Sequence, residues 1–209
     1  MRWQLGDWVF QPGWPSTLAT LLLLPSLLGL GFWQADRARQ KAELQTAFAE
    51  RFQRPSVPLA DVDPADPANR YLRVTASGRY DGAHQLLLDN QVRDGQVGYH
   101  ALTPLRLNDH TAILVNRGWL PLGASRQSLP DVAVREEPVT VTGWLAQPAN
   151  PGLWWGEATG EASTWPRVVP YVDYRRLAGP LNYRLQAAVI LLEPDAPAGY
   201  WRDWQPRFG

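Results

Sequence analysis

The sequence contains no cysteine. Disulfides, zinc–thiolate centres, thiolate haem ligation and cysteine nucleophiles are therefore excluded for this chain. It has one methionine, the first residue, and three histidines, His84, His100 and His110, whose spacing matches no common metal motif. The lack of cysteine is compatible with the cytoplasm and with an oxidising compartment, so it does not choose between them.

An excess of charge of either sign is also missing. Twenty basic residues balance twenty acidic ones, and no cluster of basic residues is suited to binding phosphates. This argues against nucleic acid as the main partner, because phosphate binding needs a basic surplus or patch. The chain has no Gly-x-Ser-x-Gly motif and no Gly-rich phosphate loop, so we expect it not to be an enzyme.

One long apolar run is present near the N-terminus. Leu18–Phe32 contains eight leucines and no charge, and Trp14 and Trp33 lie at its two ends. At 1.5 Å per residue the distance between these tryptophans is roughly 28 Å, close to the thickness of a bilayer core. We predict a tail over 1–14 and a transmembrane helix over 15–33, kinked at its internal proline. A cleaved signal peptide and a buried core helix are the alternatives.

The charges beside this segment predict one orientation. Arg37, Arg39 and Lys41 follow it, whereas the N-terminal side offers Arg2 against Asp7. The positive-inside rule would therefore place the rest of the chain in the cytoplasm.

Residues 34–54 have a helical pattern, with Leu44, Phe48 and Phe52 four residues apart on one face. This predicts an amphipathic helix whose apolar face packs on the following domain or receives a partner helix. Residues 55–69 are rich in proline and aspartate without periodicity, which predicts a linker.

The remaining residues, 70–209, contain six segments that we interpret as strands, of which the first and the fifth alternate between apolar and polar residues. These segments are Leu72–Tyr80, Gln85–Asn90, Val97–Leu105, Thr111–Trp119, Val139–Leu145 and Ala188–Glu193. Asp81-Gly82 predicts a hairpin turn between the first two. The predicted fold class is mainly β (α+β): a transmembrane helix followed by an antiparallel β sandwich or barrel-like domain with few helices. The pattern does not choose between sandwich and barrel.

Polar clusters follow two apolar runs, which we interpret as strand ends. They are Asp89-Asn90-Gln91 and Asn116-Arg117-Gly118-Trp119. The planar guanidinium of Arg117 suits a carboxylate such as a haem propionate, or it neutralises a local aspartate. In the second case Asn116 and Gly118 shape a turn and Trp119 packs.

Two further candidates concern a porphyrin. His100 follows Gly98-Tyr99, and its imidazole is either an axial haem ligand or a hydrogen-bonded structural residue. Trp154-Trp155 is either a flat platform for a porphyrin or the membrane surface, or part of the core.

Three motifs resemble the SURF1 family of cytochrome c oxidase assembly factors. They are Gly31-Phe32-Trp33-Gln34, Gly98-Tyr99 with Thr103-Pro104-Leu105, and Val115-Asn116-Arg117-Gly118-Trp119. The resemblance implies an extracytoplasmic domain on the inner (cell) membrane, and we follow it over the charge count. It also implies that the partners are the oxidase catalytic subunit and the haem a synthesis machinery.

The resemblance further implies transient contact with haem a, for which Arg117, His100, Asn116 and Trp119 are the candidate residues. The family has a second membrane helix that carries a histidine and would follow Gly209. We therefore expect this form to bind no haem tightly. The alternatives are an extracytoplasmic binding module unrelated to haem and, less favoured, an envelope enzyme.

Overall fold

The structure is a computed structural model that describes most of the chain. The described residues are 3–5, 8–10, 13–52, 54–123, 126, 128–147, 164–177 and 179–204. The predicted Trp154-Trp155 platform lies outside them, and so do the side chains of the predicted apolar face over residues 43–53. The chain divides into two compact units, one reaching Ala47 and the other running from Phe48 to Arg207.

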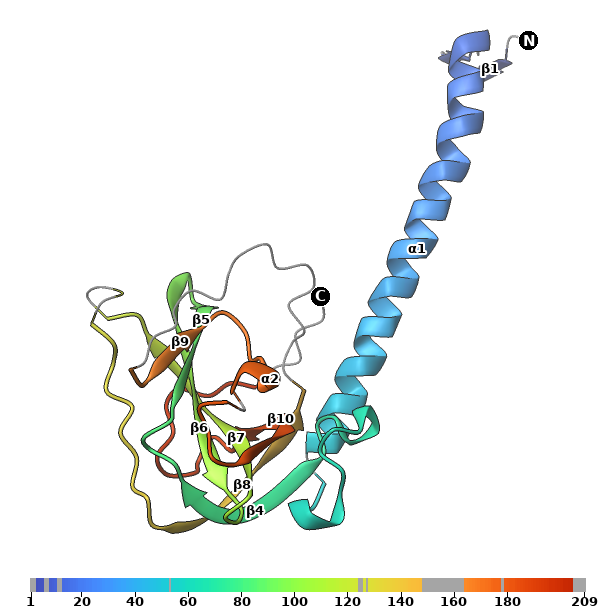
Figure 1. The fold of residues 1–209 in the computed structure, drawn as a ribbon. Coiled ribbons are helices and arrows are strands. Elements are labelled where there is room, and N and C mark those ends of the chain that lie inside the picture. The colour runs from blue at the N-terminus through green and yellow to red at the C-terminus, as the bar shows by residue number, and fades with distance from the viewer. Residues whose placement is uncertain are drawn as a thin grey trace. The chain divides into compact units, whose positions relative to one another are not determined.

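The first unit contains a short hairpin and one long helix. Strands β1 (Trp3–Leu5) and β2 (Trp8–Phe10) pair antiparallel, and helix α1 (Trp14–Phe52) follows, drawn in blue to cyan in Figure 1. The two helices that the sequence predicts over 15–33 and 34–54 are thus one continuous element, and Pro25 lies inside it.

The apolar part of α1 is long enough to cross a membrane. The span Trp14–Gln40 has 27 residues, none of it buried within the protein. Leu21 and Leu22 are 66% and 63% exposed. The hydroxyl of Ser26, which follows the internal proline, donates to the Leu22 carbonyl at 2.8 Å, as polar side chains do in membrane helices. Exposed leucines of this kind are stable only in apolar surroundings, which suggests a membrane anchor.

The second unit is a sheet that closes on itself. Its strands are β3 (Val57–Pro58), β4 (Arg73–Tyr80), β5 (Leu86–Arg93), β6 (Gln96–Arg106), β7 (Thr111–Pro121), β8 (Pro138–Ala146), β9 (Arg167–Val169) and β10 (Arg184–Leu192). Their order is β3-β4-β8-β10-β7-β6-β5-β9, and an additional β4–β6 pairing joins Tyr80 to Leu105. Strands β4, β8, β10, β7 and β6 therefore form a closed ring, so the domain is barrel-like (Figure 1).

Few helices accompany the strands, as predicted. After α1, those in the described residues are the 3-10 turns Leu59–Asp61 and Pro67–Asn69, which lie with β3 in the segment predicted as a linker, and α2 (Tyr174–Leu177).

The strand pairing differs from the prediction at two points. Most neighbours are antiparallel, but β3–β4, β5–β9 and β7–β10 are parallel. The hairpin predicted at Asp81-Gly82 is wrong, because β4 pairs with β8 and β6 and not with β5. After Tyr80 the chain crosses the end of β6, where the Asp81 amide donates to the Pro104 carbonyl at 2.8 Å. The 11-residue β6 is long enough to pair with β4 near one end and with β5 along the rest.

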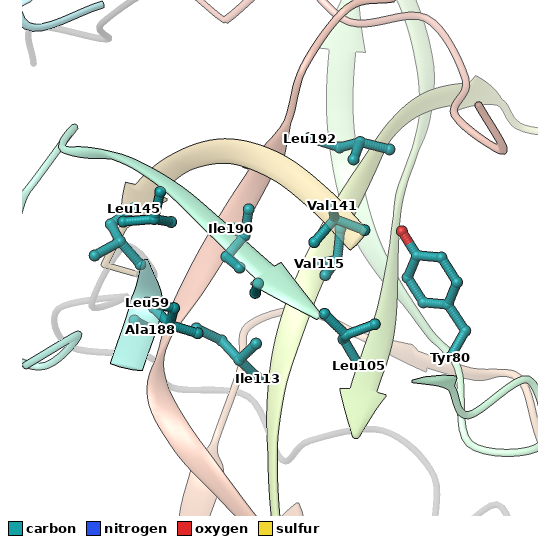
Figure 2. Packing of buried hydrophobic residues seen from close by; sticks show 12 residues of the cluster. Leu59, Tyr80, Leu105, Ile113, Val115, Val141, Leu145, Ala188, Ile190 and Leu192 are labelled. Carbon is teal, nitrogen blue, oxygen red and sulfur yellow. The ribbon is translucent and has the colours of Figure 1, made fainter. Parts of the chain in front are cut away.

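Alternation along the strands divides the core. Ile113 and Val115 of β7 face the barrel interior, whereas Ala112 and Leu114 face a second cluster outside it. Figure 2 shows the interior cluster, with Leu145 near one end and Tyr80 near the other. The next residue of the inward series on β7 is Arg117.

Candidate functional site

A β-bulge positions the Asn116–Trp119 segment. Asn116 pairs with Leu102 and Trp119 pairs with His100, so Arg117 and Gly118 together lie opposite the single residue Ala101. Gly118 has φ +115°, and a Cβ there would lie 2.6 Å from the Trp201 carbonyl oxygen. Only glycine fits this position without displacing backbone, so the Arg-Gly pair creates the bulge.

The second polar cluster also forms a bulge. Leu88 pairs with His100 and Gln91 with Gly98, so Asp89 and Asn90 together oppose Tyr99. Asn90 has φ +58°, a conformation that asparagine tolerates better than most residues. The interpretation of both clusters as strand ends is therefore wrong: both lie inside longer strands, on either side of β6.

Arg117 is buried, with 2% of its surface exposed. Its guanidinium donates to three backbone carbonyls and three side-chain oxygens. The acceptors are Ala198 O (2.6 Å), Val132 O (2.9 Å), Ala133 O (3.4 Å), Gln85 Oε1 (3.0 Å), Thr103 Oγ1 (3.2 Å) and Tyr200 Oη (3.4 Å). Thr103 in turn donates to Gln85 Oε1 at 2.7 Å. The network ties the C-terminal segment and the loop before β8 to the barrel.

The structure tests the interpretation that Arg117 neutralises a local aspartate. Among the described residues no aspartate or glutamate forms an ion pair with it, so none of the described aspartates is neutralised by Arg117. Its positive charge is stabilised by neutral acceptors, which offset the cost of burial. A contact between Arg117 and a haem propionate stays a prediction, and Arg117 would have to give up some of its hydrogen bonds to protein atoms to make it.

Asn116 and His100 are brought together on the opposite face from Arg117. Asn116 Nδ2 lies 3.2 Å from His100 Nδ1, and Asn116 Oδ1 accepts from the Gly118 amide at 3.0 Å. An amide NH₂ only donates, so Nδ1 of His100 is the acceptor and a neutral ring carries its proton on Nε2. The imidazole also contacts the Trp204 ring edge-on, with centroids 5.8 Å apart.

Trp119 packs over Gly98. A Cβ on Gly98 would lie 2.7 Å from the Trp119 ring, so this glycine makes room for the indole. Trp119 Nε1 donates to the Gln91 carbonyl at 2.8 Å, and Trp119 and Trp201 form a backbone bridge. Arg93 lies over both rings, with its guanidinium carbon 3.2 Å from the Trp201 centroid and 5.7 Å from that of Trp119.

The four candidate haem residues therefore do not surround one cavity. Arg117 faces the barrel interior, whereas its neighbour Asn116 points to the opposite face, because successive side chains of a strand alternate between the two faces of the sheet. Asn116 and His100 hold each other, and the Trp119 indole is bonded to backbone. Tyr99, the remaining motif residue, is 1% exposed in a small core cluster with Leu87 and Ala101.

A polar cluster that the sequence patterns did not indicate lies beside a hollow of about 820 Å³. Asp81 Oδ2 accepts from the Tyr183 hydroxyl at 2.7 Å and lies 2.8 Å from His84 Nδ1. Burial, together with the hydrogen bond to Asp81, raises the pKa of Tyr183. The only sequence signal was the Asp-x-x-His spacing after β4. The cluster supplies two of the ligand types that metals use, but no group of three metal-ligating side chains occurs among the described residues.

The match to known proteins covers most of the chain. The model of the SURF1 family matches residues 21–209. The chain belongs to the SURF1 family. This confirms the resemblance that the three motifs indicated, and the matched range includes α1 from Leu21 onward as well as the whole barrel.

Individual relatives in the SURF1 family match a shorter part. Surfeit locus protein 1 of Takifugu rubripes is 32% identical over 119 residues, covering 48% of this chain and 49% of its own. A SURF1-like protein of Rickettsia felis is 27% identical over 106 residues, with 50% and 46% covered. One from Dictyostelium discoideum is 32% identical over 100 residues, with 44% and 37% covered. The matched part thus spans half or less of these relatives.

Proposed function

We propose that this protein is a membrane-anchored assembly factor for haem-copper cytochrome c oxidase, and that it assists delivery of haem a to the catalytic subunit. The observation that carries the proposal is the SURF1 family match over residues 21–209. The proposed partners are the catalytic subunit and the haem a synthesis machinery. No reaction is assigned to the protein itself.

The proposed location is the inner (cell) membrane, with the barrel outside the cytoplasm. The unburied apolar span Trp14–Gln40 supports the anchor, and the family supports the orientation against the charge count after the helix. Alkaline phosphatase fused after Gly209 should be active in cells. An inactive fusion, with fluorescence from a cytoplasmic reporter at the same position, would reverse the orientation.

Haem a is the cargo in this proposal. His100 accepts from Asn116 at Nδ1, and Arg117 is fully engaged with protein acceptors. These side chains do not fit an axial ligand and a propionate partner around one porphyrin. The proposal is therefore transient assistance, and no haem ligand is assigned in the described residues.

Deleting the gene tests the assembly role. We expect oxidase activity and haem a in the isolated catalytic subunit to fall, while total membrane haem a falls less. This pattern separates delivery from haem a synthesis. Normal haem a content in the catalytic subunit of the deletion strain would refute the proposal.

Complementation tests the anchor. The wild-type chain and Leu23→Ile, which keeps the helix apolar, should restore the oxidase. Leu23→Arg places a charge near the centre of the apolar span, at a cost of about 2.5 kcal/mol or more, and should restore it poorly. Equal restoration by Leu23→Arg, at equal membrane content, would show that this span is not the functional anchor.

A further inference from the structure

A second hollow opens into the end of the barrel where Arg117 lies. Its volume is about 470 Å³. Tyr80 and Arg117 contribute to its wall, together with the polar residues Arg135, Glu137 and Thr140. Most of the remaining wall is apolar and includes Val134, Val139, Val141, Leu192, Ala196 and Pro197. An apolar hollow with a few polar groups at one end is the usual form of a small-molecule site.

Tyr80, which lines both this hollow and the one beside Asp81, carries a buried hydroxyl. The residue is 4% exposed, and its hydroxyl has no hydrogen-bond partner among the described residues. In Figure 2 the ring stands at the edge of the interior cluster, with its hydroxyl directed toward the end where Leu192 lies. Native proteins rarely leave a buried hydroxyl unpaired, because its desolvation then has no compensation.

Arg202 is a second positively charged residue near Tyr80 and Arg117. Its Nη2 donates to the carbonyls of Pro194 and Ala196, but its buried Nε and Nη1 have no partner among the described residues. Burial lowers the pKa of Arg202, against the opposing effect of Tyr80 and Asp195, and the nearby positive charge of Arg117 lowers it further. Arg202 does not line the hollow, but it lies near enough to Tyr80 and Arg117 to interact electrostatically with both.

Carboxylates near this end do not neutralise it. No ion pair within the described part of the chain includes Arg117 or Arg202. Three exposed acidic residues lie near this end: Glu137, which lines the hollow together with Arg135, Asp195, which acts electrostatically on Arg202, and Asp131, which precedes the Arg117 acceptor Val132. The inner end of the hollow therefore has a positive potential, an unused donor and, among the described residues, no paired anion.

We propose that this hollow binds a monocarboxylate with a hydrocarbon body. The carboxylate accepts from the Tyr80 hydroxyl and is attracted by Arg117 and Arg202, and the body lies against the apolar wall. A carboxylate fits better than a phosphate, because Tyr80 is the one lining residue with an unpaired buried donor among the described residues, and one hydroxyl does not compensate the desolvation of a doubly charged group. The proposal rests on the geometry of the barrel and is independent of a role in oxidase assembly.

Hexanoate and 1-hexanol form a matched pair of probes, since they share the hydrocarbon body and differ in the anionic group. We would measure both by calorimetric titration against the full-length chain in a non-ionic detergent. We expect hexanoate to bind with a stoichiometry of one and 1-hexanol at least tenfold more weakly. Equal affinity for the two probes, or no binding of hexanoate, would overturn the proposal.

Two tyrosine variants locate the site. Tyr80→Phe removes only the hydroxyl and should weaken hexanoate binding about tenfold. Tyr174→Phe is the control, because the Tyr174 hydroxyl is also buried without a partner among the described residues but packs in the cluster outside the barrel. Unchanged hexanoate affinity in Tyr80→Phe, or an equal loss in Tyr174→Phe, would place the ligand elsewhere.

A third variant fills the hollow. Ala196→Phe introduces a ring into its wall and should abolish hexanoate binding while the melting temperature stays within a few degrees of the wild type. A folded Ala196→Phe variant that binds hexanoate normally would refute the assigned cavity. None of these titrations uses the oxidase, so their failure and the failure of the assembly role are distinguishable.

Discussion

Replacing Tyr80 with phenylalanine should stabilise the ligand-free protein. The ring packs in the barrel interior, while the buried hydroxyl has no partner among the described residues. Phenylalanine keeps the packing and removes the uncompensated desolvation of the hydroxyl, which is worth about 1–3 kcal/mol in such positions. We expect the free energy of unfolding to rise by at least about 1 kcal/mol.

The advantage of Tyr80→Phe should grow at high pH. Burial raises the pKa of Tyr80 from 10.0 to about 12, against the opposing effect of Arg117 and Arg202. The unfolded chain therefore releases this proton before the native state does, and stability falls as pH rises from 10 to 12. The variant lacks the group, so its advantage should increase by about 1 kcal/mol between pH 9 and pH 11.

Urea unfolding followed by tryptophan fluorescence measures both effects. Tyr71→Phe is the control, because the Tyr71 hydroxyl accepts from Arg70 at 3.0 Å and its removal should give no gain. If Tyr80→Phe lost more than about 1 kcal/mol at pH 7, the hydroxyl would have to donate to a protein group. The reasoning on the unused donor, and with it the proposed carboxylate contact, would then be wrong.

Two further substitutions test the site around the bulge. Gly118→Ala should lower the free energy of unfolding by at least about 2 kcal/mol, because the residue has φ +115° and the new Cβ meets the Trp201 carbonyl. The control Gly95→Ala, at φ +78° in open space, should cost only about 1 kcal/mol. Equal losses in the two variants would show that the Trp201 contact does not matter. Arg117→Lys should cost about 3 kcal/mol, since an ammonium cannot reach the same acceptors, and the exposed Arg126→Lys should change stability by less than about 0.5 kcal/mol. Normal stability of Arg117→Lys with reduced haem a in the oxidase would instead support a direct contact with cargo.

Local sequence patterns determined the elements of this protein. The leucine run predicted the apolar helix, because length and the absence of charge suffice for a membrane span. Alternation predicted β4 and β8, because side chains of a strand alternate between its two faces, and apolar runs of strand length predicted most of β6, β7 and β10. The family also followed from short motifs, and Gly98 and Gly118 in them are needed where backbone or an indole approaches closely.

Only the tertiary structure decided how these elements combine. Closure of the ring depends on pairing Tyr80 with Leu105, and the parallel pairing of β10 with β7 joins residues far apart in the chain. Such pairings depend on the free energy of the whole sheet, which no local pattern contains. The surroundings of Arg117 were likewise decided by the tertiary structure. Its type predicted a carboxylate partner, but the bulge and the inward face placed it in the barrel, where carbonyls and hydroxyls surround it. The unpaired Tyr80 hydroxyl became visible for the same reason, since whether a buried group has a partner depends on neighbours that only folding brings together.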